Sequence, residues 1–287
     1  MRVLTLGYLS IADADPVELI QAAAKAGFSA VGLRITGRRP EEDLRPEIVA
    51  NPAAITRIRR CLSDCGMRLS NISTYHLYPE IRIEDLRPVV QASASMGADF
   101  MVAGCYDRER SRRADFLGRY GELAAASGMR IALEPVSYSA AASLGDAYDL
   151  VLAAQQANLG LLLDPLHLAR GGDTPDRIRG IDPKRIFYAQ LCDADLRRPE
   201  GMDLAEEART MRLYPGEGSL PLAEFLRALP EGIEIEAEVP SRADRHLSAD
   251  ARAAILHQRV ASYLERIGAT GSAGPGSDAH GHGTHRD

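Results

Sequence analysis

Lysine is almost absent from this chain. Lys25 and Lys184 are the only two, and arginine carries nearly all of the positive charge. Acidic residues outnumber basic residues by 40 to 34, so the net charge is −6. A protein without an excess of positive charge lacks the electrostatic footprint that binds nucleic acid or an anionic membrane surface. We therefore expect neither partner, and we interpret the arginine content mainly as genomic bias that leaves room for local basic loops to hold an anionic small molecule.

Cysteine is also scarce, and long apolar runs are missing. The four cysteines are Cys61, Cys65, Cys105 and Cys192, and no pair has the CxxC spacing of a zinc or redox site. We expect reduced thiols. The first residues, "MRVLTLGYLSIADADP", lack the apolar core and cleavage site of a signal peptide. No segment approaches the about 18 apolar residues of a membrane span, so the expected location is the cytoplasm.

Short apolar segments of β type alternate with longer amphipathic segments along the chain. Helices expected at 16–26, 146–157 and 248–267 illustrate the pattern, and several helix ends are followed by glycine and then a strand, as in "KAGFSAV" and "SMGADFM". The expected strands are 2–9, 29–35, 68–74, 99–104, 130–136, 159–164, 185–192 and 233–239. This order predicts a single (β/α)8 TIM barrel over residues 1–268 with a disordered Gly-rich tail over 269–287. A doubly wound sheet is the alternative, but no GxGxxG or phosphate-binding loop follows the first strand.

Acidic and amide side chains stand near the ends of four consecutive late strands. These residues are Glu134, Asp164, Gln190 and Glu238. The carboxyl ends of barrel strands meet at one rim, where converging carboxylates repel one another unless a cation lies among them. Oxygen ligands of this kind suit a hard divalent ion such as Mg²⁺ or Mn²⁺. Any one of these residues alone is more often a surface or salt-bridge residue, and Glu234 and Glu236 alternate with Glu238 without being predicted ligands.

Several basic residues are candidates for contacting a substrate at the same rim. His167 follows Asp164 in "LLLDPLHLAR", on the loop expected after the sixth strand, and either packs under that loop or faces the substrate. His76 follows the third strand. Among the arginines, the predicted substrate contacts are Arg34, Arg170 and Arg212, because a guanidinium suits a carboxylate or phosphate. The high arginine content makes a surface role the alternative for each.

The motifs "LEP", "LLLDPLHLAR", "FYAQLCDA", "RLYPGEGSLPL" and "EAEVPS" resemble the xylose isomerase-like barrel family of sugar phosphate isomerases and epimerases. The resemblance implies that Glu134, Asp164, Gln190 and Glu238 bind one divalent ion, Mn²⁺ or Mg²⁺ first and Co²⁺ or Zn²⁺ as alternatives. Glutamine at the third position is similar to the hydroxypyruvate isomerase branch, from which the long seventh loop departs. The endonuclease type of the family uses three zinc ions and more histidines, and this chain lacks those histidines.

The expected chemistry is proton transfer beside a carbonyl group. Glu134 and Glu238 would move protons on and off carbon, while the ion stabilises an enediolate. The leading prediction is a metal-dependent isomerase or epimerase of a small hydroxy-carbonyl compound in carbohydrate metabolism. A dehydratase of the 3-dehydroshikimate or inosose type is the first alternative, and a non-catalytic ligand-binding barrel is the second. The sequence leaves a homo-oligomer open.

Overall fold

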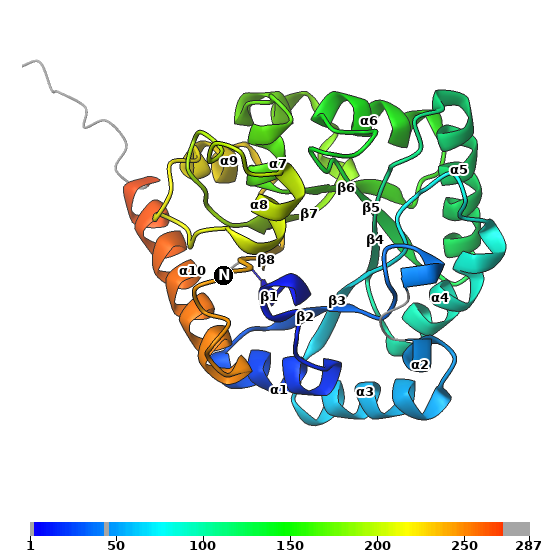
Figure 1. Cartoon of the computed structure of the whole chain (residues 1–287), viewed down its shortest axis with the longest axis horizontal. Helices are drawn as coiled ribbons and strands as arrows, with labels where there is room; N and C mark the ends of the chain where they lie inside the picture. The colour runs from blue at the N-terminus through cyan, green and yellow to red at the C-terminus, as the bar shows by residue number, and fades with distance from the viewer. Residues whose placement is uncertain (1–2, 43–45, 272–287) are drawn as a thin grey trace, which may run out of the picture.

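The computed structural model of the 287-residue chain describes residues 3–42 and 46–271. Eight parallel strands close into a barrel in the order of the sequence, and helices surround it as an outer ring (Figure 1). The strands are β1 Leu4–Leu6, β2 Ala30–Arg34, β3 Arg68–Ser73, β4 Phe100–Gly104, β5 Arg130–Glu134, β6 Leu159–Leu163, β7 Ile186–Leu191 and β8 Ile235–Ala237. The predicted (β/α)8 barrel is confirmed, and each strand lies within its expected segment.

The helices connect the strands on the outside of the barrel. The α-helices are α1 Pro16–Ala26, α2 Pro46–Val49, α3 Pro52–Asp64, α4 Ile83–Met96, α5 Arg110–Ala125, α6 Leu144–Ala153, α7 Pro165–Arg170, α8 Leu204–Thr210, α9 Leu222–Ala228 and α10 Ala249–Gly271. Four 3₁₀ turns add η1 Tyr8–Ile11, η2 Pro40–Glu42, η3 Pro175–Gly180 and η4 Pro183–Arg185. Helix α10 continues to Gly271, beyond the expected end of the barrel at residue 268. The rest of the predicted tail lies outside the described residues.

Helix α1 shows how the sequence sets its own boundaries. The Asp15 side chain accepts hydrogen bonds from the backbone N–H groups of Val17 and Glu18, and Pro16 occupies the first turn, where its missing N–H costs nothing. Gly27 ends the helix at φ 94°, a left-handed conformation that glycine adopts without steric penalty. The chain then enters β2. The recurrent helix–glycine–strand pattern in the sequence therefore marks the short loops that connect each helix to the next strand of the barrel.

The barrel interior is apolar on one side and polar on the other. Phe100, Val102, Ala132, Leu162 and Tyr188, from β4 to β7, form a separate buried apolar cluster. Buried polar side chains come instead from β1, β3, β7 and β8, namely Thr5, Asn71, Gln190 and Glu236. The main apolar core lies between the strands and the helices. Burying polar groups inside a barrel is destabilising unless they are hydrogen-bonded. This polar half of the interior therefore indicates a functional site at the carboxyl ends of the strands.

Two expectations about the whole chain are tested within the described residues. None of the helices there is both long and apolar enough to cross a membrane. All four cysteines have free thiols, as expected.

Candidate active site

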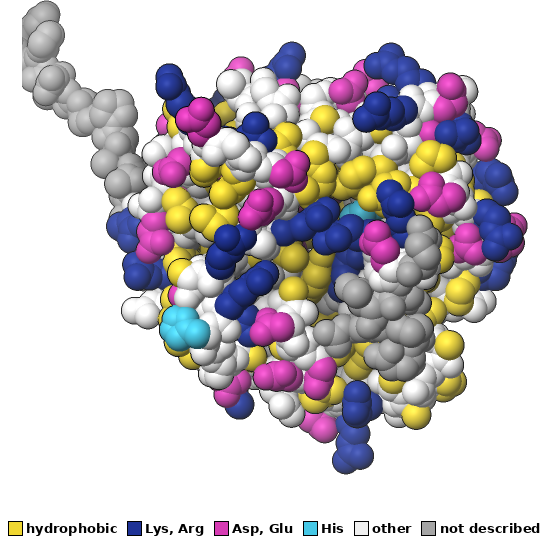
Figure 2. Space-filling model, viewed as in Figure 1, with side chains coloured by type: hydrophobic (Ala, Val, Ile, Leu, Met, Phe, Trp, Pro, Cys, Tyr) yellow, Lys and Arg dark blue, Asp and Glu magenta, His cyan; other side chains and the backbone are white. Residues whose placement is uncertain are grey.

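A pocket opens at the carboxyl ends of the strands. It is lined by residues from the ends of most strands together with the loop after β7. On the face shown in Figure 2, Arg side chains gather around the central hollow. The carboxyl ends of barrel strands are where small-molecule ligands bind in barrels of this kind.

The four predicted metal ligands lie at this rim. Glu134 is the last residue of β5, Gln190 lies in β7 and Glu238 follows β8, and all three line the pocket. Asp164 follows β6 and caps α7, where its Oδ1 accepts hydrogen bonds from the backbone N–H groups of Leu166 and His167 at 2.8 and 3.0 Å. Asp164 therefore stabilises the start of α7, in addition to any ligand that it binds.

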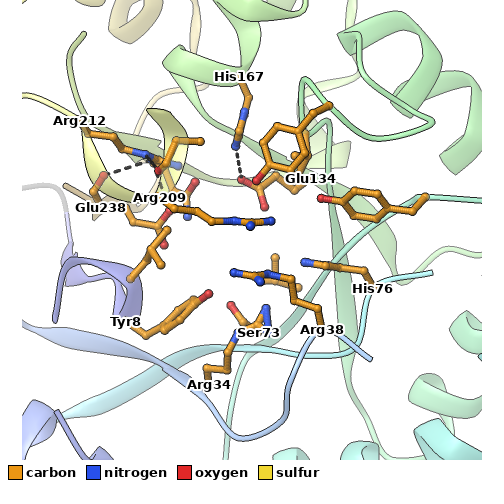
Figure 3. A pocket seen from close by; sticks show the side chains of 17 residues that line it. Tyr8, Arg34, Arg38, Ser73, His76, Glu134, His167, Arg209, Arg212 and Glu238 are labelled. Carbon is orange, nitrogen blue, oxygen red and sulfur yellow. Dashed lines mark hydrogen bonds and ion pairs between the residues drawn. The ribbon is translucent and has the colours of Figure 1, made fainter. Parts of the chain in front are cut away.

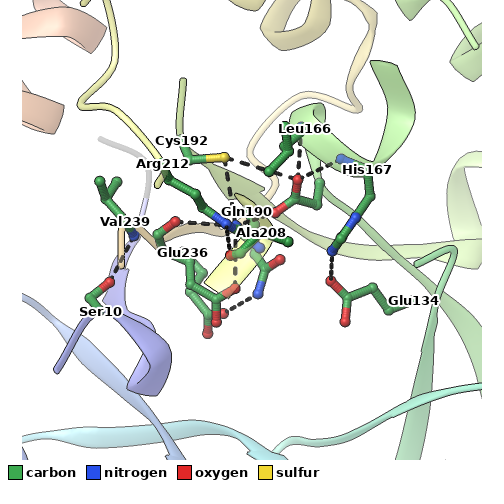
Figure 4. A network of polar contacts seen from close by, with 12 residues as sticks. Ser10, Glu134, Leu166, His167, Gln190, Cys192, Ala208, Arg212, Glu236 and Val239 are labelled. Atoms are coloured by element: carbon green, nitrogen blue, oxygen red, sulfur yellow. Dashed lines mark hydrogen bonds and ion pairs between the residues drawn. The ribbon is translucent and has the colours of Figure 1, made fainter. Parts of the chain in front are cut away.

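Arg212 supplies the cation among these carboxylates (Figure 4). Its Nη1 lies 2.6 Å from Asp164 Oδ2 and 3.4 Å from Glu238 Oε2, and the Arg212 side chain is 1% exposed. Its Nε donates to the carbonyl of Ala208 at 2.7 Å, which ties the guanidinium to α8. A buried carboxylate pair needs such compensation, because uncompensated charge is strongly disfavoured in a protein interior.

The carboxyl groups differ in how readily they ionise. Burial, followed by the charges of Glu238 and Asp164, raises the pKa of Glu134 well above its ordinary value. Burial also raises the pKa of Glu238 to about 7, against the opposing charge of Arg212. For Asp164, burial acts in the same direction, but Arg212, His167 and the helix N–H bonds outweigh it and lower its pKa. One rim thus holds both proton-retaining and ionised carboxyl groups, as acid–base catalysis requires.

Two neutral histidines face the pocket in a defined tautomer. The backbone N–H of Gly104 donates to His76 Nδ1 at 2.9 Å, and that of Ser137 donates to His167 Nδ1 at 3.4 Å. Because Nδ1 accepts in both rings, the proton resides on Nε2. Burial lowers the pKa of His167 to about 4 and that of His76 well below its usual value. His167 Nε2 lies 3.7 Å from Glu134 Oε1 (Figure 3).

His167 lies in the first turn of α7, so its predicted position on a loop is wrong. The short helix forms because Asp164 caps it and Pro165 fits its first position. This helical turn fixes the direction of the imidazole more firmly than a loop would.

Three arginines, Arg34, Arg38 and Arg209, line the pocket. Arg34, from β2, has its guanidinium carbon 5.2 Å from the ring centre of Tyr8, and Arg209, from α8, lies 5.5 Å from that of Tyr138. Arg38 and Arg209 point toward one another across the pocket (Figure 3). None of these three arginines forms an ion pair with a described residue. Their converging positive charges repel each other, so this arrangement suits an anionic group between them.

The structure does not place Arg170, a predicted substrate contact, among the residues that line the pocket. Its guanidinium binds Glu207 through Nε at 2.9 Å and through Nη2 at 2.7 Å, and it also donates to the carbonyls of Asp195 and Leu196. Arg170 leaves α7 on the side that packs on α8 and therefore anchors the loop after β7. The predicted contacts Arg34, His76, His167 and Arg212 do line the pocket.

The prediction of individual contacts missed Arg38 and gave Arg209 less weight than its neighbour Arg212. Arg38 follows β2 in "RITGRRP", where two adjacent arginines offer no sequence signal to separate them. Arg209 lies in the last turn of α8, and Arg212 follows two residues after the end of that helix, so both arginines enter the pocket from one short segment of the chain. Their closeness in the sequence was a usable signal.

The donor atoms suit a divalent ion in their chemistry. Three carboxyl groups and an amide are hard oxygen ligands, and Gln190 Oε1 is buried without a hydrogen-bond partner. Within residues 3–42 and 46–271, however, no three His, Cys, Asp or Glu side chains lie close enough together to hold a metal ion. The guanidinium of Arg212 stands between Asp164 and Glu238. The donor chemistry of these residues therefore fits a divalent ion.

Comparison with known proteins agrees with this geometry. Residues 20–259 match the model of the xylose isomerase-like TIM barrel family, and the chain belongs to that family. A 3-dehydroshikimate dehydratase of Pseudomonas aeruginosa is 31% identical over 223 residues, which cover 73% of this chain and 33% of that protein. An inosose isomerase of Bacillus velezensis is 28% identical over 224 residues, covering 74% of this chain and 78% of that protein.

The fold is shared with solved structures as well. The structure of IolI protein with a bound zinc atom has a TM-score of 0.77 at 18% identity and covers 93% of this chain and 99% of that one. The chain spans about a third of the length of the curated dehydratases that it matches. The curated relatives are dehydratases and isomerases, so the proteins that this chain resembles are enzymes.

Proposed function

We propose that this protein is a divalent-metal-dependent lyase that dehydrates a cyclic hydroxy-ketone carrying a carboxylate, of the 3-dehydroshikimate type. The observation that carries the proposal is the set of three arginines, Arg34, Arg38 and Arg209, which enter the pocket without an acidic partner among the described residues. A neutral polyol gives these charges nothing to bind, whereas a substrate carboxylate does. The similarity to the Pseudomonas dehydratase supports the same choice.

In this proposal Glu134, Asp164, Gln190 and Glu238 would hold the ion, with Mn²⁺ or Mg²⁺ preferred for all-oxygen ligation. Zn²⁺, the ion in the IolI structure, and Co²⁺ are alternatives. When bound, the ion supplies a Lewis acid for a substrate carbonyl. The arginines then orient the ring by its carboxylate, so that the carbon beside the ketone faces the glutamates.

The proton transfers are assigned to side chains of the chain itself. Glu238, with a pKa of about 7, takes the proton from the carbon beside the ketone. Glu134 and His167 stand together on another wall of the pocket and return a proton to the neighbouring hydroxyl, which leaves as water. The C–H electron pair becomes the new C=C bond as the C–O bond breaks, so no oxidant is needed. Loss of a further ring proton to the solvent and protonation of the ketone oxygen give the aromatic product.

His76 supports this reaction as a donor rather than as a base. Its Nδ1 is occupied by the Gly104 N–H, and the nearby arginines together with burial keep the ring neutral. Nε2–H is therefore available to donate to a substrate oxygen. A neutral donor of this kind stabilises developing negative charge without exchanging its own proton.

The test is product analysis with the full chain, stripped by a chelator and reloaded with Mn²⁺ or Mg²⁺. With 3-dehydroshikimate we expect growing ultraviolet absorbance from the aromatic product, and none before the ion is restored. Absorbance that grows equally in the metal-free protein, or no turnover with either ion, would refute the proposal.

A metal-dependent isomerase or epimerase is the second candidate. The similarity to inosose isomerase covers most of that protein, and the same glutamate pair would move a proton between faces or between adjacent carbons through an enediolate. Incubation with an inosose in ²H₂O separates the two candidates. Isomerisation gives a product of unchanged composition, with deuterium exchanged onto carbon and no new chromophore.

A further inference from the structure

Three buried polar side chains meet inside the barrel below the pocket. Asn71, Gln190 and Glu236 come from β3, β7 and β8, and they are 2%, 4% and 2% exposed. Glu236 Oε1 accepts a hydrogen bond from Gln190 Nε2 at 2.8 Å, and Glu236 Oε2 accepts one from Asn71 Nδ2 (Figure 4). Glu236 does not line the pocket, but Gln190 does. Glu236 therefore contacts the site only through another residue.

The carboxamide of Gln190 has two chemically different ends, and Glu236 distinguishes them. In its ionised form Glu236 only accepts hydrogen bonds, and here its two oxygens accept from the amide NH₂ groups of Gln190 and Asn71, so it draws the NH₂ end of Gln190 toward itself. The carbonyl end, Oε1, is then left without a partner and buried. An unpaired buried polar atom is destabilising by about 1–3 kcal/mol, and a bound ion is one way to satisfy it.

Two glycines next to Asn71, Gln190 and Glu236 leave the space that these side chains occupy. At Gly32, on β2, a Cβ atom would lie 2.8 Å from Asn71 Oδ1 and 2.9 Å from Glu236 Oε2. At Gly7 a Cβ atom would lie 3.1 Å from Glu236 Cγ. Two glycines thus allow the buried carboxyl group to fit, and Asn71 holds the oxygen that does not bind Gln190.

We propose that Glu236 is a positioning residue that fixes the Gln190 amide with Oε1 toward the pocket, so that glutamine serves as a neutral oxygen ligand for the divalent ion. The inference rests on the proposed function only for the presence of that ion, not for the substrate. It accounts for a buried glutamate one pleat below Glu238 that the proton transfers do not use. It also gives a reason for the strand-eight pattern "EIEAEVPS".

The experiment measures Mn²⁺ affinity by calorimetry and the electron paramagnetic resonance spectrum of the bound ion. Glu236→Gln keeps the shape but presents both a donor and an acceptor, so Gln190 is free to turn over. We expect Mn²⁺ to bind roughly 10- to 100-fold more weakly, as for other residues that orient a ligand. In a Gln190→Ala background the same substitution should cause no further weakening, because the group that it orients is gone.

Glu234→Gln is the matched control. It removes a carboxylate from the same face of β8, where Glu234 binds Arg68 Nη2 at 2.6 Å and Thr5 Oγ1 at 2.5 Å and does not touch Gln190. Mn²⁺ affinity should be unchanged. Circular dichroism and thermal unfolding establish that each variant folds. Should Glu236→Gln fail to fold, Asn71→Ala releases one oxygen of the glutamate and should weaken Mn²⁺ binding several-fold.

Equal weakening in the Gln190→Ala background, or unchanged affinity in Glu236→Gln, would overturn the positioning role. A wild-type protein that binds no Mn²⁺ would also overturn it. A wild-type protein that binds one Mn²⁺ but does not dehydrate the substrate would refute the proposed function alone, and the variant series would still decide the role of Glu236.

Discussion

Arg212 Nη1 lies 2.6 Å from Asp164 Oδ2, and both side chains are 1% exposed or less. The same nitrogen approaches Glu238 Oε2 and donates to the Glu238 carbonyl at 3.2 Å. One guanidinium therefore balances two carboxylates that the metal is proposed to use. A buried arginine held in this way makes the site stable before any ion arrives, and it makes the arginine and the ion alternative sources of the same positive charge.

Replacing Arg212 by Met should destabilise the chelator-treated protein by about 3–5 kcal/mol, because Asp164 and Glu238 lose their buried partner. Saturating Mn²⁺ should recover a larger part of the stability in this variant than it adds to the wild type, because the ion then supplies the missing charge. Urea unfolding with chelator and with Mn²⁺ measures both effects.

Arg68→Met is the control for that experiment. Arg68 pairs with Asp99 and Glu234 at the opposite end of the barrel, away from the pocket. Its loss should also lower stability, but Mn²⁺ should not restore it. Equal recovery in both variants would show that Mn²⁺ stabilises the barrel without replacing the charge of Arg212.

The metal-free protein should lose stability as the pH rises from 6.5 to 8. Burial raises the pKa of Glu238 to about 7 and that of Glu236 to about 8, so the native state retains protons that the unfolded chain has already released. The unfolding free energy therefore falls with rising pH until both groups have ionised. Below pH 6.5 the neutral His167 acts in the opposite sense, because its native pKa of about 4 lies below its unfolded value.

Urea unfolding at closely spaced pH values in chelator measures this slope, to which the opposing contribution of the histidine becomes steadily smaller as the pH rises above 6.5. Glu236→Gln removes one of the buried glutamates whose pKa is raised, alongside Glu134 and Glu238, and should flatten the slope. A stability that stays constant or increases over this interval would contradict the assignment of raised pKa values to the two glutamates.

Arg209→Ala should lower kcat/KM for a carboxylate-bearing substrate roughly 10- to 100-fold, since a hydrogen bond to a charged group is worth about 1.5–3 kcal/mol. The loss should appear mainly in KM, because Arg209 binds the end of the substrate that does not react. Steady-state kinetics with the restored ion measure it. Arg119→Ala, on the exposed face of α5, is the control and should leave both constants unchanged.

A neutral inosose offers a second comparison for Arg209→Ala. If the pocket is built for a carboxylate, the substitution should affect turnover of the neutral compound much less than turnover of the acid. Equal losses on both compounds would show that Arg209 holds the shape of the pocket and does not recognise charge.

The sequence determined the barrel and the rim residues. Strand and helix periodicity, together with glycine after helices such as α1, specifies the βα repeat, because these signals act over a few residues. A parallel barrel then brings strand ends to one side whatever the side chains are, so Glu134, Asp164, Gln190 and Glu238 could be placed together from the sequence.

Tertiary structure decided which polar residue partners which. Arg170 and Arg209 look alike in a chain rich in arginine, yet Arg170 is bound by Glu207 and Arg209 is left facing the pocket. Alternation put Glu234, Glu236 and Glu238 on one side of the segment that contains β8. Their different depths in the barrel gave them separate partners: Arg68, Gln190 and Arg212. An ion pair or hydrogen bond depends on the distance between side chains that are far apart in the chain, and only the closed barrel fixes that distance.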